Sequence, residues 1–138
     1  MVNHGAGSGG LIIGEAFASR PLSTLPADLR PLATALQAHG FTVRIALPPR
    51  SDTVGQFDPR SRTFLHEATH AVQSCPAGVV RPIGWTLPLD PAVERGIQTI
   101  LFHGYPTNRD AEREAFTVQG QPDAVPRLLQ ALRQRCRR

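Results

Sequence analysis

The sequence is poor in the residues that mark several classes of protein. Its 138 residues include two cysteines, one tryptophan and one tyrosine, and every basic residue is an arginine. No stretch approaches the roughly 20 apolar residues that a transmembrane helix needs. Near the start of the chain, the apolar run of Leu11, Ile12 and Ile13 has no arginine before it, which is not typical of a signal peptide. We therefore expect a cytoplasmic protein without a membrane span.

The two cysteines do not form a metal-binding or redox motif. Cys75 and Cys136 are far apart in the sequence, and there is no C-x-x-C pair. In a cytoplasmic protein, two reduced thiols that pack as small apolar side chains are the expected state. A disulfide between the two positions stays open as the alternative.

The arginine surplus gives a formal net charge of +4. Four of these arginines gather near the end of the chain: Arg133, Arg135, Arg137 and Arg138. Cations are favoured in the last turn of a helix by the helix dipole, and a charge run is usually a solvated face. Because interleaved aromatic residues and a known binding module are both lacking, we expect no nucleic-acid partner. An arginine-rich nucleic-acid-binding protein is the least favoured alternative.

Length and composition predict a single domain after a flexible start. Residues 1–24 are rich in glycine, serine and proline. Within them GAGSGG fits the pattern G-x-G-x-x-G, but a dinucleotide-binding loop needs a strand before it. We therefore interpret 1–24 as a flexible segment and 25–138 as one domain.

Apolar periodicity predicts more helices than strands. Apolar and polar residues alternate over 41–47, which indicates a half-buried strand, and 54–57 is a weaker candidate. Asp90 and Pro91 are suited to the N-cap and first position of a helix. Helices are expected over 27–39, from 61 or 62 to 74, over 91–104, from 107 or 108 to about 119, and over 123–135.

The second of these helices contains the stretch TFLHEATHAVQ, in which His66, Glu67 and His70 spell H-E-x-x-H. Two histidines four residues apart share one helix face and can bind the same Zn²⁺. Glu67 points about 100° away from His66, where a general base for a zinc-activated water belongs. The opposite side of the helix is apolar, which predicts that it packs on the core: Phe64, Leu65, Ala68, Ala71 and Val72.

A catalytic zinc site needs a third protein ligand. Gln73 and Pro76 stand where the pattern H-E-x-x-H-x-x-G-x-x-H would have its glycine and last histidine, so a third histidine of that kind is excluded. The candidates further along the chain are His103, Asp110, Glu112 and Glu114.

Glu112 is the preferred third ligand. On the helix that ends near 119, Glu112 falls inside an apolar arc, and a carboxylate there needs a partner such as a metal. Glu114, at the edge of this arc, is the alternative ligand. Pairing of Glu112 with an arginine also stays open.

Four further side chains are candidates for supporting roles. Tyr105 and His103 precede the Glu112 helix and could stabilise an oxyanion, although structural roles for both stay open. Gln73 and Ser74 lie on the polar side of the histidine helix and could orient the zinc ligands through hydrogen bonds.

HEATH on a helix, followed by a helix with the pattern E-x-x-A-x from Glu112 to Phe116, resembles the gluzincin branch of the zincin metallopeptidases. The resemblance covers about 54–119. It implies a small α+β domain in which a short mixed or antiparallel sheet packs on the H-E-x-x-H helix and further helices follow. It also implies a peptide or protein substrate that lies along the strand at 54–57. Phe116 stands where the family often has an aspartate.

By this resemblance, His66, His70 and Glu112 would hold one Zn²⁺ and Glu67 would be the catalytic base. The expected function is that of a zinc-dependent metallopeptidase, in which Glu67 takes a proton from the water that attacks the peptide carbonyl. The alternative is a non-catalytic zinc-binding relative with a regulatory or partner-binding role.

Overall fold

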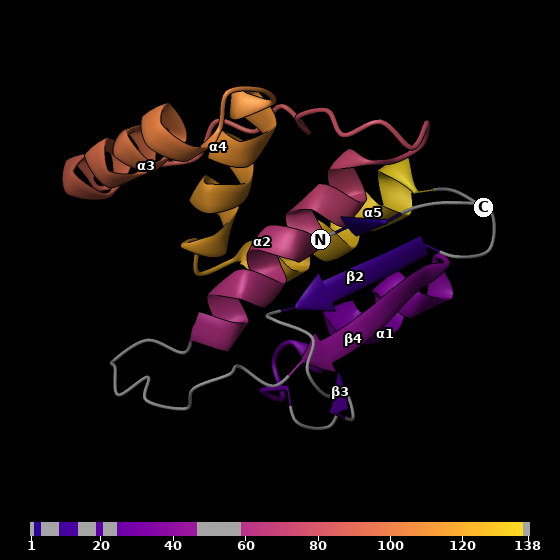
Figure 1. The fold of residues 1–138 in the computed structure, drawn as a ribbon. Helices are drawn as coiled ribbons and strands as arrows, with labels where there is room; N and C mark the ends of the chain where they lie inside the picture. Colours follow the sequence, from indigo (N-terminus) through magenta and orange to yellow (C-terminus); the bar gives the residue numbers. More distant parts are fainter. Residues whose placement is uncertain (1, 4–8, 14–18, 21–24, 47–58, 137–138) are drawn as a thin grey trace.

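The computed structural model describes residues 2–3, 9–13, 19–20, 25–46 and 59–136 (Figure 1). Within these ranges five helices occur where the sequence predicts them, with boundaries that differ by up to three residues. They are α1 (Arg30–Ala38), α2 (Pro59–Gln73), α3 (Pro91–Gly104), α4 (Arg109–Gln119) and α5 (Ala124–Arg135). None of the described helices has both the length and the apolar character that crossing a membrane requires.

Local sequence sets several helix ends. The Asp90 carboxylate accepts a hydrogen bond from the backbone N–H of Ala92 at 2.8 Å, as predicted for the start of α3. Gly40 has a φ of 95°, a left-handed conformation suited to glycine, and it separates α1 from the next strand. Asn108, one of the two predicted caps, precedes α4, but its side chain makes no capping hydrogen bond.

Helix α2 is packed as its periodicity predicts. The five residues on its apolar side are all buried in the main core: Phe64, Leu65, Ala68, Ala71 and Val72. The core also takes in leucines of α1 and α5, and α2 contacts α4 more extensively than any other element. His66 and His70 therefore face α4, because the opposite side of α2 is occupied by the core.

Four short strands form one sheet in the order β1-β2-β4-β3. They are β1 (Val2–Asn3), β2 (Gly9–Ile13), β3 (Ser19–Arg20) and β4 (Phe41–Ala46). Strand β2 runs parallel to β4, whereas β1 and β3 pair antiparallel at the two edges.

Strand β4 confirms the strand predicted after α1, but the sequence interpretation missed β2. Gly9 and Gly10 fall within 1–24, the segment that its glycine, serine and proline content predicts to be flexible. In the structure, these glycines lie opposite Phe41 and Thr42 of β4. The partner strand supplies the backbone hydrogen bonds that the local sequence does not predict.

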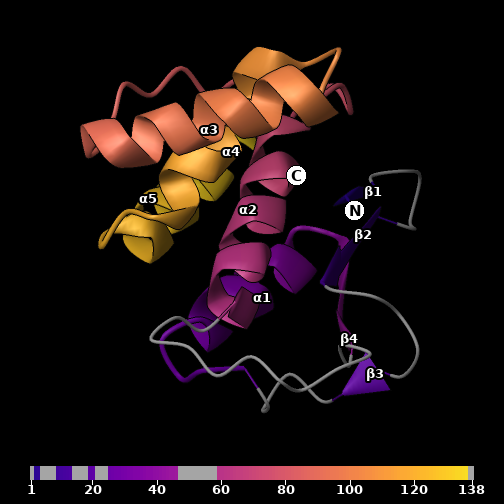
Figure 2. The same ribbon diagram turned by 60° about the vertical axis from the view of Figure 1, so that its left-hand side comes forward.

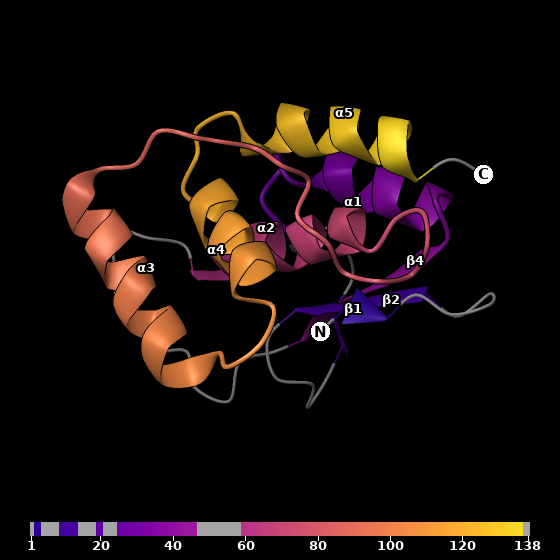
Figure 3. The same ribbon diagram turned by 90° about the horizontal axis from the view of Figure 1, so that it is seen from above.

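The expected α+β zincin-like architecture is wrong. The described chain is mostly helical: its helices have 9 to 15 residues, whereas β1 and β3 have two residues each. The layer against the histidine face of α2 is a helix, α4, and not a sheet (Figures 1 and 3). The physical reason is that α2 packs most extensively on α4, while α1, α2 and α5 bury apolar faces of helical period in one core that β4 shares through Phe41 and Val43. The strand expected over 54–57, with the substrate edge that the resemblance implies there, lies outside the described residues.

The expectation of two reduced thiols is also wrong. Cys75 and Cys136 form a disulfide that joins the end of α2 to the end of α5. Arg135 reinforces this junction by donating hydrogen bonds to the carbonyl oxygens of Val72 and Cys75, at 3.4 and 3.1 Å. Disulfides persist mainly in oxidising compartments, so this bond does not support the expected cytoplasmic location.

Candidate metal centre

His66 and His70 bring two imidazole nitrogens together on one face of α2. Their Nε2 atoms are 3.1 Å apart, and the two rings meet edge to face with centroids 4.8 Å apart. This proximity follows from their spacing of one helical turn. When neither Nε2 atom carries a proton, the lone pairs of the two atoms repel each other at this distance. A proton or a metal cation between the two atoms removes this repulsion.

Glu112 completes the cluster from the facing helix. Its Oε2 lies 3.1 Å from Nε2 of His66, and its Oε1 lies 2.7 Å from Nε2 of His70. The side chains of the two histidines and of Glu112 are between 11% and 17% exposed, so the cluster is largely screened from solvent without being sealed. These three residues, the His–His–Glu group, could hold a metal ion. The preferred third ligand of the sequence analysis is thus the carboxylate that lies against both histidines.

Small residues on α4 let Glu112 come this close. Ala111 and Ala115 are both buried, and α4 packs directly on α2. Because alanine has the smallest side chain that still favours a helix, the two backbones can approach closely at these positions. Figure 2 shows α4 crossing α2, with α3 on its outer side.

Gln73 fixes the ring of His70. Its Nε2 donates to the Ala111 carbonyl and to Oε1 of Glu114, both at 2.9 Å. With its nitrogen committed to two acceptors, Gln73 turns its Oε1 to Nδ1 of His70, at 2.7 Å. His70 therefore carries a proton on Nδ1, and the Nε2 that faces Glu112 is the atom left to bind a cation. Gln73, one of the two predicted supporting residues on α2, thus contacts His70 directly.

Gln119 plays the corresponding part for His66, and the sequence analysis missed it. Its Oε1 lies 2.9 Å from Nδ1 of His66. A signal was present, because Gln119 follows Glu112 by seven residues, which is two helical turns and the same face of α4. Both histidines are thus oriented through Nδ1 by glutamine oxygens, the arrangement by which outer groups usually fix metal-binding histidines.

Glu114, the alternative third ligand, lies behind Gln73 rather than in the His–His–Glu group. Its carboxylate accepts hydrogen bonds from the backbone N–H groups of Ile83, Gly84 and Trp85, at 2.6, 2.8 and 3.0 Å, in addition to the bond from Gln73. Glu114 is buried, whereas Glu112 keeps some exposure, which reverses the order of depth expected from the helical wheel. Four donors satisfy this carboxylate, so it anchors the loop before α3 to α4.

The charged side chains of the His–His–Glu group shift one another's pKa values. Burial alone would raise the pKa of Glu112, but hydrogen bonds from His66 and His70 and their charges outweigh it and lower the pKa to about 2. Burial works against a charged His70, but its hydrogen bonds to Glu112 and Gln73, with the charges of Glu112 and Glu67, raise its pKa above the ordinary value. The group thus favours a carboxylate beside a protonated histidine, so a metal ion that binds there has to displace that proton.

Glu67 and Tyr105 lie within electrostatic range of this group. Burial, together with the negative charges of Glu112 and Glu67, raises the pKa of Tyr105. Phe116 packs between the two sides of the site, with its ring centroid 4.4 Å from that of His66 and 5.8 Å from that of Tyr105. Phe116, in the position where an aspartate is common in gluzincins, is therefore an apolar wall of the site.

Two of the predicted supporting residues do not lie in the site. His103 is exposed near the end of α3 and packs against the ring of Phe102, with centroids 5.2 Å apart. Ser74 is buried, and its hydroxyl donates to the carbonyl of Ala71 in the preceding turn, at 2.6 Å. Ser74 thus supports the end of α2 and does not contact the histidines.

Comparisons of the chain with protein-family models, with curated proteins and with solved structures found no match. The likeness to gluzincin metallopeptidases therefore rests on the residues of this chain alone. What the geometry shows is that His66, His70 and Glu112 form a group that could hold a metal ion.

Proposed function

We propose that the protein is a zinc-dependent hydrolase of peptide bonds in which His66, His70 and Glu112 hold the metal and Glu67 is the general base. One observation carries this proposal. Two imidazole Nε2 atoms converge on one carboxylate, while both Nδ1 atoms are held by glutamine oxygens. That arrangement leaves two imidazole nitrogens and the two carboxylate oxygens of Glu112 facing one another, which is what a bound cation requires.

The donor set fits zinc. Two histidines and one glutamate are a ligand set of catalytic zinc sites, in which a fourth position stays open. Tetrahedral coordination at about 2.0–2.1 Å would place the ligand atoms roughly 3.3 Å from one another. The two Nε2 atoms are 3.1 Å apart and lie 3.1 and 2.7 Å from different oxygens of Glu112, and one ligand atom from each residue falls within 4.8 Å of the others. Zinc held there would polarise a substrate carbonyl and make a water molecule more acidic.

Glu67 is suited to move the proton. It follows His66 directly on α2 and points about 100° away from it around the helix, so it stands beside the ligand group and not within it. Its charge acts on both His70 and Tyr105, which places it in electrostatic range of both sides of the site. In the proposed reaction, the Glu67 carboxylate takes a proton from the attacking water and later gives it to the leaving amine.

Tyr105 is suited to stabilise the developing oxyanion. A tyrosine hydroxyl is protonated at neutral pH, and the raised pKa of Tyr105 favours this form further, so the hydroxyl can donate a hydrogen bond. Contact with Phe116 holds its ring on the side of the site that His66 also faces. His103, the other candidate, is exposed and takes no part in this proposal.

The test is to replace Glu67 with glutamine and to measure both zinc content and peptide hydrolysis. Glu67→Gln keeps the shape of the side chain but removes the base, so zinc binding should persist while turnover falls by a factor of about 100 or more. Glu94→Gln, on α3, is the control and should change neither. If the wild-type protein binds zinc but cleaves nothing in a broad peptide library, the non-catalytic alternative replaces this proposal.

A further inference from the structure

Residues 80–90 connect α2 to α3 without forming a helix or a strand. From Pro82 to Asp90, exposed and half-buried residues alternate at every position. A period of two is typical of an extended chain that packs one side on a protein core. The half-buried side includes Trp85 and Leu87, which pack against the main core. Residues 85–89, the extended segment, therefore have one covered face and one face in solvent.

The backbone of the extended segment has few hydrogen-bond partners. The N–H of Trp85 donates to the Glu114 carboxylate, at 3.0 Å. The carbonyl of Pro88 accepts a hydrogen bond from Gln121, at 2.8 Å. Further N–H groups have no acceptor within the part of the chain that the structure describes: those of Thr86, Leu87 and Leu89. Unpaired donors along an extended chain are a template for pairing with a second extended chain.

A groove with a volume of about 540 Å³ lies beside the extended segment. The segment lines one side of the groove, and α3 and α4 line the other. Three of the four charged residues in this lining are acidic: Glu94, Asp110 and Glu114, whereas the fourth is Arg113. The groove therefore carries a net negative charge, which attracts a cationic ligand.

Asp110 is the carboxylate best placed to receive such a ligand. Arg113 already pairs with Glu94, and four donors satisfy Glu114. Asp110 is exposed, and its carboxylate has no ion pair or hydrogen bond with any residue in the described ranges. A basic side chain of a ligand in the groove would therefore find its counter-charge at Asp110.

Trp85 offers a further donor to the groove. It is the single tryptophan of the chain, and the guanidinium of Arg127 lies over its ring, 5.7 Å from the centroid. Its indole N–H has no acceptor among the described residues, and this nitrogen is not fully buried. A tryptophan with an apolar body and an available N–H is frequent in protein interfaces.

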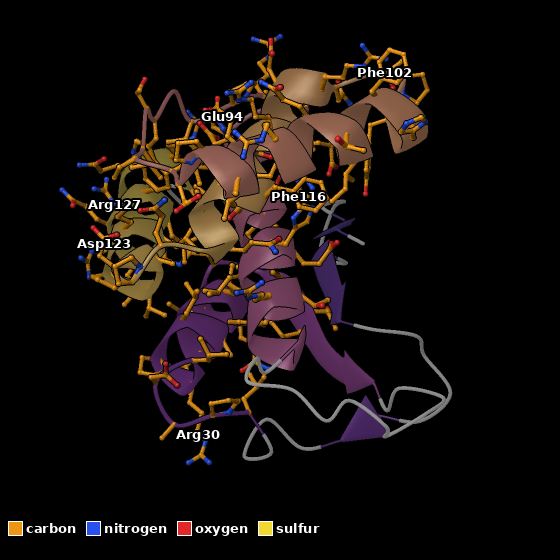
Figure 4. The ribbon with its side chains drawn as sticks, turned by 90° about the vertical axis from the view of Figure 1, so that its left-hand side faces the viewer. Arg30, Glu94, Phe102, Phe116, Asp123 and Arg127 are labelled. Carbon is orange, nitrogen blue, oxygen red and sulfur yellow. A yellow bond between two sulfur atoms is a disulfide. The ribbon has the colours of Figure 1, made fainter. Side chains whose placement is uncertain are left out.

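The groove is separate from the His–His–Glu group. Around α4, Arg113 and Asp110 lie about 100° and 160° from Glu112, so they face a different side. In Figure 4, Phe116 lies between α3 and α2, on the side of the metal group, whereas Glu94 lies further from α2. A ligand in the groove therefore leaves the metal group accessible.

We propose that this groove binds an extended segment of another protein that carries a basic side chain. The bound segment pairs its backbone with the extended segment, as an added strand does at a sheet edge. One of its carbonyl groups accepts from the indole N–H of Trp85, and its basic side chain pairs with Asp110. The inference goes beyond the proposed hydrolase function and does not depend on a metal.

The experiment is a fluorescence titration of the full chain with a pentapeptide, capped at both ends, in which valine and threonine flank a central arginine. Valine and threonine favour an extended chain. The emission of Trp85 reports the groove, because no other tryptophan is present. We expect saturable binding with a dissociation constant below about 1 mM, and the same affinity in the presence of a metal chelator.

Two changes test the two parts of the proposal. Asp110→Asn should weaken binding of the arginine peptide about fivefold at low salt, whereas Asp28→Asn, the same change at an exposed residue before α1, should not. N-methylation of two adjacent residues of the peptide removes one donor from each of its edges. It should weaken binding by about fivefold or more, since each lost hydrogen bond contributes about that factor.

Hydrogen exchange on the wild-type protein gives an independent measurement. On peptide binding, at least one of the amides of Thr86, Leu87 and Leu89 should exchange roughly tenfold more slowly, as expected for an N–H that enters a ladder. Absence of binding, or equal binding of the methylated peptide, would overturn the proposal. So would self-association that Asp110→Asn abolishes, because the groove would then be an interface between copies of this chain.

Discussion

Replacement of Gln73 is expected to have two measurable effects, one on stability and one on metal binding. It is fully buried, and its three hydrogen bonds tie His70 on α2 to the Ala111 carbonyl and the Glu114 carboxylate on α4. In Gln73→Met the side chain keeps nearly the same length but loses all three bonds. Glu114 keeps its three backbone donors. The group that is left without its hydrogen-bond acceptor is therefore the Nδ1–H of His70.

Two effects of this substitution can be separated. An unsatisfied buried donor costs about 1–3 kcal/mol, so the metal-free variant should lose that much free energy of unfolding. In addition, the His70 ring is no longer held in the tautomer that exposes Nε2. Loss of such an outer hydrogen bond usually weakens metal binding by about 10- to 100-fold, which is about 1.4–2.7 kcal/mol.

The assay is a competition titration of zinc against a chromophoric chelator, with chemical denaturation of the metal-free protein alongside. Gln121→Met serves as the control, because Gln121 also donates to a backbone carbonyl, at 2.8 Å, but does not contact a histidine. If Gln73→Met loses stability while its zinc dissociation constant stays within about twofold of the wild type, the reasoning about the tautomer is refuted.

Four further changes have defined outcomes. Glu114→Gln removes the acceptor for two backbone N–H groups, so the free energy of unfolding should fall by about 3 kcal/mol while zinc still binds, as denaturation and metal analysis would show. Because the pKa of His70 is raised above 6.5, zinc has to displace a proton, and its apparent affinity should fall roughly tenfold per pH unit below that raised pKa, measured by titration at a series of pH values. In the metal-free protein, the stability that this shift contributes is complete below pH 6.5 and is lost as the pH rises through the raised pKa. Reduction of the Cys75–Cys136 disulfide, which closes a loop with a sequence separation of 61, should lower the free energy of unfolding by about 4 kcal/mol in denaturation experiments. Tyr105→Phe should keep zinc but reduce kcat about 100-fold, and an unchanged kcat would remove Tyr105 from the mechanism.

The parts of the site that the sequence predicts are those set by helical periodicity. His66, His70 and the buried apolar side of α2 follow from residue spacing alone, whereas on α4 the helical wheel placed Glu112 deeper than Glu114 and the structure has the reverse. Gln73 was predictable for the same reason. Periodicity assigns a side chain to a face of its own helix, and for His66, His70 and Gln73 this is enough to predict that the three side chains lie on the side of α2 away from the core.

What the sequence does not predict depends on contacts between distant segments. Nothing near Glu114 indicates that it accepts hydrogen bonds from Ile83, Gly84 and Trp85, about 30 residues earlier. Strand β2 exists because β4 pairs with it, although its own glycines disfavour a strand. The α+β expectation was wrong because a helix, α4, occupies the side of the histidine helix where the resemblance implied a sheet.

The central claim is that His66, His70 and Glu112 together hold one zinc ion. The most direct test is metal analysis of the purified wild-type protein beside Glu112→Ala and Asp110→Ala, where Asp110 is an exposed carboxylate two residues earlier on the same helix. We predict close to one zinc per chain in the wild type and in Asp110→Ala, and loss of most of it in Glu112→Ala. A wild-type protein that takes up no zinc, or a Glu112→Ala variant that binds it as tightly as the wild type, would contradict the account.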